Sequence, residues 1–120
     1  MSASGTIYEF GDVVLVPFPF SSDPRESKQR PGVIISNSTY NIGTSDLIIA
    51  GVTSVLTNTG FSIPVAQIDM ERGMMPAKSL IKYGNIYTLR KDLVVKSIGR
   101  INANKRAELI KALSSLFNGT

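Results

Sequence analysis

The sequence predicts a mainly β domain: a small antiparallel barrel or sandwich with one helix at its C-terminal end. Several short runs rich in β-branched residues are spread along the chain, and turn-forming residues separate them. Only the last segment changes to helical periodicity. The 120 residues contain no internal repeat and no linker rich in Pro, Gly or Ser, so we expect a single domain covering residues 1–120.

The first predicted strand covers residues 13–18, which are apolar and largely β-branched. Pro17 and Pro19 place its far end at a sheet edge or in a loop, because proline cannot donate to a strand ladder. Residues 70–78 begin with Met70 and hold Gly73, Pro76 and two further methionines, and we expect a loop there. The remaining predicted strands are residues 32–36, 47–53, 62–65, 79–82, 86–89 and 93–100.

Residues 102–117 are predicted to form the helix. Apolar side chains recur there at positions i, i+1, i+4, i+7 and i+8, which lie on one helical face: Leu109, Ile110, Leu113, Leu116 and Phe117. Asn102 or Asn104 can cap the start of this helix, and the Asn118–Gly119 pair can end it.

The composition excludes several kinds of chemistry. The chain has no cysteine, so it can form neither a disulfide framework nor a thiolate metal site. It also has no histidine, which removes the commonest general acid or base and the commonest metal ligand. Any catalysis must therefore use Arg, Lys, Asp, Glu, Ser, Thr or Tyr, and we expect no metal and no cofactor.

Charge and hydropathy bear on partners and location. The net charge is +4 and the pI is about 9.6, which suits a polyanionic partner, although many small proteins are mildly basic. Residues 1–6 lack the pattern of a secretory signal, and the longest apolar run, residues 47–52, is too short to span a bilayer. We therefore expect a soluble, cytoplasmic protein that does not engage a membrane.

The most informative segment joins two apolar runs through a charged loop. The string G-D-V-V-L-V-P-F-P-F is followed by polar residues 21–29 and then by R-P-G-V-I-I-S-N. Pro31 fixes its own φ and favours an extended backbone at Arg30. A guanidinium held in this way suits bidentate recognition of phosphate and stabilisation of developing negative charge. The segment predicts phosphodiester chemistry or nucleic-acid binding and leaves both open.

Two further strings accompany this segment. Residues 48–54 read I-I-A-G-V-T-S, a buried strand that ends in two hydroxyls. Residues 76–82 read P-A-K-S-L-I-K, and I-G-R-I follows before the final helix. Together the three strings resemble the MazF/PemK family of toxin endoribonucleases from toxin–antitoxin pairs. The resemblance covers residues 10–117, and the combination of the R-P and T-S strings is what makes it specific.

The resemblance implies one MazF/PemK-like domain with an SH3-like barrel and a C-terminal helix, acting as a homodimer. It also implies metal-independent cleavage of single-stranded RNA and inhibition by a cognate antitoxin protein. In that reaction the ribose 2′-hydroxyl attacks the adjacent phosphorus and leaves a 2′,3′-cyclic phosphate and a free 5′-hydroxyl. A chain without histidine or cysteine is compatible with this chemistry, because the nucleophile belongs to the substrate.

The resemblance assigns roles to individual residues. Arg30 matches the catalytic arginine, which would clamp the pentacoordinate phosphate, and Thr53 matches the active-site threonine, which would donate to the same phosphate. Ser54 and Ser79 are candidates for substrate contact. The alternatives are an ordinary surface arginine, an ordinary strand-end threonine and plain polar strand residues.

The loop before Arg30 departs from the family pattern. Many members carry a glutamate five residues before the arginine, whereas this chain has Arg25 there. Glu26 follows it and Asp23 lies two residues earlier, so these two carboxylates are the candidates for the general base or for substrate contact. The alternative for both is a solvated loop charge, and the base stays unassigned.

A basic rim and aromatic side chains complete the candidate binding surface. Lys28, Arg25 and Lys82 would join Arg30 in following a phosphate backbone. Unpaired bases could stack on three aromatic residues, for which core packing is the alternative: Phe20, Tyr40 and Phe61. Phe18 is expected in the core, and the loops at residues 20–29, 55–61 and 69–78 would set the RNA sequence recognised.

Three functions are open at this point. The first is a sequence-selective endoribonuclease held inactive by an antitoxin whose acidic tail folds into the basic groove. The second is a non-enzymatic CcdB-like toxin that binds DNA gyrase. The third is a module that binds RNA or a partner after losing its general base.

Overall fold

The computed structural model describes residues 6–18, 28–57 and 60–119. In this part of the chain seven strands form one sheet in the order β4-β6-β3-β2-β1-β7-β5, and every recorded pairing is antiparallel. The strands are β1 (Asp12–Phe18), β2 (Lys28–Ile34), β3 (Asp46–Thr53), β4 (Ile63–Val65), β5 (Met70–Gly73), β6 (Ser79–Arg90) and β7 (Lys96–Ile101). The helices are α1 (Ser38–Gly43) and α2 (Ala103–Asn118), with single 3₁₀ turns at Gln67–Asp69 and Lys91–Leu93.

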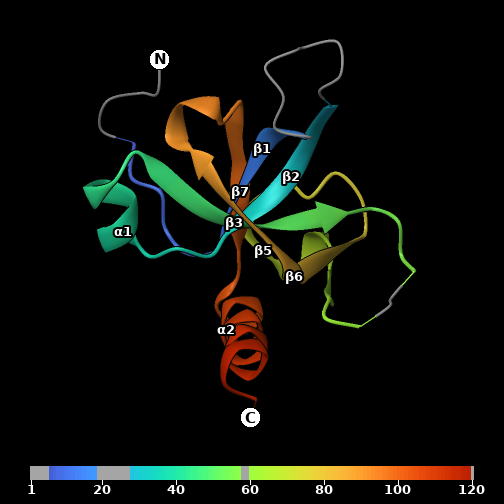
Figure 1. Cartoon of the computed structure of the whole chain (residues 1–120). Coiled ribbons are helices and arrows are strands. Elements are labelled where there is room, and N and C mark those ends of the chain that lie inside the picture. Colours follow the sequence, from blue (N-terminus) through green and yellow to red (C-terminus); the bar gives the residue numbers. More distant parts are fainter. Residues whose placement is uncertain (1–5, 19–27, 58–59, 120) are drawn as a thin grey trace.

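The sheet curls into a half-barrel. Its two edge strands, β4 and β5, are consecutive in the chain and only the short Gln67–Asp69 turn lies between them. Val65 and Met70 are five residues apart, so they can be separated by at most roughly 18 Å of extended chain. The two edges must therefore approach each other, and α2 extends from the end of β7 below the sheet (Figure 1). The predicted mainly β antiparallel fold with a C-terminal helix is confirmed.

Both faces of the central strands are buried, which is why the chain shows continuous apolar runs there. Val13, Val33, Val52 and Ile81 pack on one face together with Leu109 of α2. Val14, Val16, Ile34, Leu47, Ile49 and Leu89 pack on the other face with Tyr8. Adjacent valines such as Val13 and Val14 point to opposite faces because side chains alternate along a strand.

The expected loop at residues 70–78 is wrong in its first half, where Met70–Gly73 forms edge strand β5 against β7. Gly73 suggested a turn, yet it is the residue that allows the pairing. Its φ is +76°, and a Cβ there would lie 2.1 Å from the carbonyl oxygen of Ile98. Only glycine permits this approach.

The other corrections concern β6, β2, β7 and α1. The two short strands expected at residues 79–82 and 86–89 are one strand, β6, and β2 begins at Lys28, four residues before the expected start. The strand expected at residues 93–100 begins only at Lys96, because Leu93 belongs to the preceding 3₁₀ turn. The short helix α1 was not predicted, and its N-cap Asn37 accepts from the backbone N–H of Tyr40 at 3.0 Å. A helix of 6 residues is too short to show an apolar period.

Helix α2 matches its prediction at both ends. The Asn102 side chain accepts from the backbone N–H of Lys105 at 2.8 Å, and Gly119 takes a left-handed φ of +74°. The apolar face is only partly covered: Leu109 is fully buried, whereas Ile110 is 55% and Phe117 73% exposed. Within the described ranges, no helix is both long and apolar enough to cross a membrane.

Candidate active site

A cleft of about 160 Å³ opens across strands β1, β2, β3 and β6. It brings together three residues that the sequence singled out, Arg30, Thr53 and Lys82. The other lining residues are Val16, Phe18, Pro31, Ile49, Gly51, Val52, Asn85 and Tyr87.

A glycine helps to explain why the sheet is hollow here. Gly51 of β3 lines the cleft and lies opposite Gly32 of β2 on one side and Lys82 of β6 on the other. Paired residues in a sheet point to the same face, but Ile49 fills the space over Gly32, where a Cβ would lie 3.1 Å from the Ile49 Cδ1. A Cβ on Gly51 would meet a Tyr87 ring carbon at 3.6 Å, an ordinary contact, so the glycine leaves open space rather than avoiding a clash.

A break in β6 forms one wall of the cleft. Gly51 pairs with Lys82, whereas its neighbour Ala50 pairs with Ile86, so residues 83–85 bulge out of the ladder. Both Lys82 and Asn85 line the cleft as a result. The bulge is tied to the preceding loop, because the Gly84 N–H donates to the Phe61 carbonyl at 3.3 Å.

Arg30 lies opposite Val16 of β1, near the outer end of β2. If the β2–β3 register continued two residues beyond the Gly32–Gly51 pair, Arg30 would face Thr53. The Arg30 guanidinium carbon lies 6.0 Å above the centre of the Phe18 ring. Arg30 is exposed, and within the described ranges it forms no ion pair with a carboxylate.

Thr53 is the last residue of β3, and a hydrogen bond fixes its hydroxyl. The Thr53 oxygen accepts from the backbone N–H of Val55 at 3.1 Å. A hydroxyl has one proton to donate besides its acceptor lone pairs. The proton of Thr53 is therefore available to an acceptor in the cleft while the oxygen is held in place.

The cations of the described residues fall into two groups, one paired with carboxylates and one not. Arg72, Arg90, Arg100, Lys105 and Arg106 each pair with a carboxylate. In the described part of the chain, no such pair is found for Lys28, Arg30, Lys78 and Lys82, which lie in or near the cleft, nor for Lys91, Lys96 and Lys111, which do not line it.

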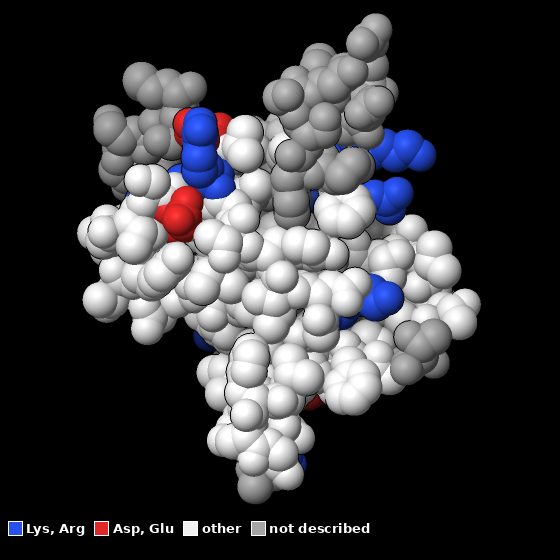
Figure 2. Space-filling model, in the orientation of Figure 1, with Lys and Arg blue, Asp and Glu red and all other residues white. Residues whose placement is uncertain are grey.

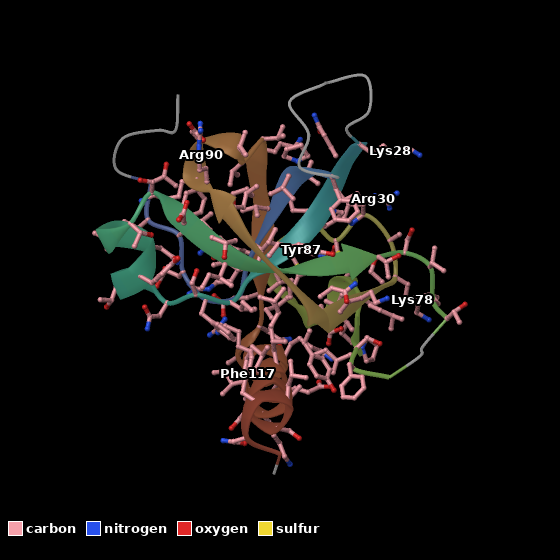
Figure 3. All side chains as sticks on the ribbon, in the orientation of Figure 1. Lys28, Arg30, Lys78, Tyr87, Arg90 and Phe117 are labelled. Carbon is pink, nitrogen blue, oxygen red and sulfur yellow. The ribbon has the colours of Figure 1, made fainter. Side chains whose placement is uncertain are left out.

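Figure 2 shows where charged side chains lie on one face of the molecule. Basic atoms on the right side have no acidic atoms of described residues beside them, whereas acidic and basic atoms lie side by side at the upper left. Lys28, Arg30 and Lys78 lie along that right side in Figure 3, with Tyr87 further in on the sheet and Arg90 on the far side. Of the described residues, no three Asp or Glu side chains come together in a group that could hold a metal ion.

The two serines lie in a second hollow, of about 260 Å³, which shares Arg30, Pro31 and Val52 with the first. Ser54 is exposed there, whereas Ser79 is buried and its hydroxyl donates to the Ala77 carbonyl at 2.9 Å. The structure therefore does not bring these hydroxyls into the cleft of Arg30 and Thr53.

The remaining predicted residues are distributed as follows. Phe20, Asp23, Arg25 and Glu26 lie outside the described residues. Lys28 is exposed, two residues before Arg30 on the same face of β2. Phe61 lines a third hollow with Lys82, Asn85 and Leu116, whereas Tyr40 belongs to α1 and lines none of these hollows. No carboxylate of a described residue lines the cleft.

Three of the polar and aromatic side chains that line the cleft were not predicted to do so: Asn85, Tyr87 and Phe18. Phe18 was expected in the core but is only half-buried. Asn85 lies between the two short strands expected at residues 79–82 and 86–89, where the structure has the bulge of β6. The alternation of side chains between the two faces of β6 is interrupted at this bulge, so the sequence pattern does not identify Tyr87 as a cleft residue.

The resolved pKa shifts concern groups outside the cleft. Burial raises the pKa of Asp12, an effect only partly opposed by the Glu9 N–H that it accepts and by Arg100 at 3.6 Å. The Arg106 guanidinium, hydrogen-bonded at 2.9 Å, lowers the pKa of Glu71. These groups join β1, β5, β7 and α2, so their roles are structural.

Solved structures with the same fold come from several bacteria. An endoribonuclease from a mycobacterial species, in complex with its cognate antitoxin, is 19% identical with a TM-score of 0.73, over 92% of this chain and 94% of that chain. MazF from Deinococcus radiodurans is 18% identical with a TM-score of 0.70, over 96% and 99%. Mycobacterium tuberculosis toxin MazF-mt6 is 17% identical with a TM-score of 0.71, over 89% and 96%.

At these identities the likeness shows the fold alone, and no curated protein matches the chain in sequence. The family is shown by a separate comparison. The family model described as "PemK-like, MazF-like toxin of type II toxin-antitoxin system" matches residues 9–117, nearly the whole chain. The chain therefore belongs to the PemK-like, MazF-like family of type II toxin–antitoxin toxins.

Proposed function

We propose that this protein is a metal-independent endoribonuclease toxin that cleaves single-stranded RNA in the cleft between β1, β2, β3 and β6. The observation that supports this most strongly is that Arg30, Thr53 and Lys82 line one cleft. Arg30 and Thr53 were assigned from two sequence strings that lie in different strands, β2 and β3, and these strands pair with each other.

In the proposed reaction the scissile phosphate enters the cleft and its non-bridging oxygens accept from the Arg30 guanidinium and the Thr53 hydroxyl. Lys82 adds positive charge at the opposite wall. The ribose 2′-oxygen bonds to phosphorus as the bond from phosphorus to the 5′-oxygen breaks, which leaves a 2′,3′-cyclic phosphate and a 5′-hydroxyl. Donors placed where negative charge develops stabilise this transition state.

Proton transfer needs a base for the 2′-hydroxyl and a donor for the leaving 5′-oxygen. Glu26 and Asp23 remain the proposed candidates for the base. The segment that carries them connects Phe18 to Lys28, and these two residues are paired beside Arg30. Arg30 is the proposed donor to the leaving oxygen.

The preference for single-stranded RNA rests on an aromatic side chain beside the cations. Phe61 is exposed and lines the hollow next to the cleft together with Lys82, and this ring, not those of Phe18 and Tyr87, is the one proposed to stack on bases. Unpaired bases can stack on such rings, whereas paired bases in a duplex cannot. Sequence selectivity would come from the loops that border these hollows.

The proposed partners are a cognate antitoxin and a second copy of the chain, in the cytoplasm. The mycobacterial neighbour was solved with its cognate antitoxin, as were Deinococcus radiodurans MazF structures with MazE. The basic side of this molecule suits an acidic antitoxin segment that folds on binding.

The test is incubation of a long single-stranded transcript with the protein in excess EDTA, followed by mapping of cut sites and end groups. We expect cleavage with cyclic-phosphate ends. Arg30→Ala should lower the rate by about 10²–10³-fold. Arg90→Ala removes the same charge at a site outside the cleft, where Arg90 pairs with Asp92, and should leave the rate unchanged. Equal cleavage by Arg30→Ala, or no cleavage by the wild-type protein, would contradict the proposal.

A second candidate is an RNA-binding module without catalysis, favoured by the lack of a described carboxylate in the cleft lining. Fluorescence anisotropy would then show RNA binding that depends on Arg30, and the bound RNA would stay intact. Detection of cyclic-phosphate ends rules this candidate out.

A further inference from the structure

We infer that Phe18 and Tyr87 act as positioning residues for Arg30, holding its guanidinium over the cleft through the face of the Phe18 ring. This rests on the proposed function, because it assigns a role in cleavage to side chains that need not touch the phosphate. Arg30, Phe18 and Tyr87 come from β2, β1 and β6, and all three line the same cleft.

Sheet register places the ring beside the guanidinium. Arg30 pairs with Val16, and Phe18 lies two residues further along β1 on the same face. Phe18 is therefore the diagonal neighbour of Arg30, a distance that aromatic and long side chains can bridge. The Arg30 guanidinium carbon lies 6.0 Å from the ring centre, within the range of a cation–π contact.

Tyr87 fixes the ring in turn. The Phe18 and Tyr87 ring centres are 5.8 Å apart and their planes meet at 72°, an edge-to-face arrangement. Tyr87 is itself held in β6 opposite Ile49, which is buried. The contact therefore extends from the buried sheet to the exposed arginine.

An aromatic support suits a phosphate-binding arginine better than an ion pair does. A carboxylate partner would use the N–H donors of the guanidinium and cancel its charge. A ring face restricts the side chain and leaves the N–H donors at the guanidinium edge available to phosphate oxygens. This accounts for an exposed arginine that is supported although no described carboxylate pairs with it.

The first test is steady-state cleavage of a short fluorogenic RNA by Phe18→Leu. Loss of the ring face should lower kcat by about three- to tenfold while KM stays close to the wild-type value. Phe18→Tyr keeps the ring at position 18 and should have a kcat close to the wild-type value. Tyr87→Phe keeps the ring at position 87 and should also have a kcat close to the wild-type value. Phe10→Leu is the matched control, because Phe10 packs against the core under α2 and should leave kcat unchanged.

A double-mutant cycle separates positioning from direct contact with RNA. If Phe18 acts through Arg30, Phe18→Leu should have no further effect on kcat in the Arg30→Ala background. The same loss in both backgrounds, or a change confined to KM, would assign the ring to stacking on a base and overturn the inference.

An NMR measurement tests the contact between Phe18 and Arg30 independently of RNA cleavage. In the wild-type protein the ring current of Phe18 should shift the side-chain Nε–H resonance of Arg30 upfield in NMR spectra. Phe18→Leu should remove that shift, Phe10→Leu should not, and an unchanged Arg30 resonance in Phe18→Leu would contradict the inference. If the wild-type protein shows this shift but leaves RNA intact, the proposed function fails while the contact between Phe18 and Arg30 stands.

Discussion

The position of Arg30 is determined by its neighbour in the sequence and by two residues of the adjacent strand. Pro31 restricts its backbone, Val16 pairs with it across the sheet, and Phe18 lies under its guanidinium. Thr53 complements it, since its oxygen is held by the Val55 N–H and its proton is available to an acceptor in the cleft. Two donors of different kinds can thus act on one phosphate.

The account predicts the effect of removing the Thr53 hydroxyl. Thr53→Val keeps the shape of the side chain but lacks both the donor and the acceptor for the Val55 N–H. We expect a fall of about 10²-fold in kcat, and only a small change for Thr53→Ser, which keeps the hydroxyl. Single-turnover cleavage of RNA measures both. Wild-type rates in Thr53→Val would show that the hydroxyl does not act on the phosphate.

Asp12 provides a prediction on stability and pH. Burial raises its pKa above the ordinary value of 3.8, so just above that pH the folded state retains a proton that the unfolded state has lost. The contribution of Asp12 to stability is therefore fully present below pH 3.8 and is lost as the pH rises through the raised pKa.

The measurement is urea unfolding from pH 3.5 upward for the wild-type protein and Asp12→Asn. The wild-type free energy of unfolding should decrease relative to that of Asp12→Asn as the pH rises from about 4. The lowered pKa of Glu71 acts in the opposite direction, because its contribution is lost as the pH falls, but it is common to both proteins and cancels. A relative gain by the wild-type protein would contradict the assignment.

At the scale of elements, the cleft depends on Gly51 of β3 and on the bulge of β6. Gly51 leaves one position on the cleft face without a side chain, and both Lys82 and Asn85 at the bulge line the cleft. The shape of the site therefore depends on a missing side chain and on an irregular strand as much as on the functional side chains.

Filling the cleft floor should separate activity from folding. Gly51→Ala adds a Cβ in ordinary contact with Tyr87, so the melting temperature should stay the same or rise slightly. Gly51→Val places further methyl groups in the cleft, and we expect RNA cleavage to fall by at least tenfold while thermal unfolding stays cooperative. Gly43→Ala in α1, where a Cβ would meet nothing within 4 Å, is the control. Full activity of Gly51→Val would place the reaction elsewhere.

The elements show what the sequence could and could not predict. Strands β1, β3 and β4 and helix α2 follow from apolar runs, period and capping residues. Strand β5 could not be predicted, because Gly73 is a turn signal in sequence and a close-approach residue in space. The convergence of Arg30 and Thr53 follows from the family resemblance, whereas Asn85 and Tyr87 depend on where β6 bulges, which no local pattern encodes.

At the scale of the whole molecule, charge is divided between two regions. Four cations of β5, β7 and α2 are matched by carboxylates, namely Arg72, Arg100, Lys105 and Arg106, although Lys96 and Lys111 in these elements pair with no described carboxylate. Lys28, Arg30, Lys78 and Lys82 on the cleft side have no ion-pair partner among the described residues. This division gives the molecule one side suited to a polyanion (Figure 2). RNA and an acidic antitoxin segment would compete for that side.

Salt dependence tests this division. RNA affinity should fall with salt, and removing one phosphate-contacting lysine should reduce the slope of log K against log salt by about 0.7 for a single strand. We expect this for Lys28→Ala and no change of slope for Arg90→Ala, with anisotropy of a labelled 2′-deoxy-substituted RNA as the measurement. Equal slopes for the two variants would show that the phosphate backbone does not follow the cleft side.

The structure of the protein with an RNA that carries one 2′-deoxy nucleotide at the cut site tests the central claim most directly, because this RNA lacks the nucleophile and stays intact. We predict that oxygens of a single phosphate accept from both the Arg30 guanidinium and the Thr53 hydroxyl. A phosphate bound elsewhere, or one that reaches only one of these two groups, would contradict the account.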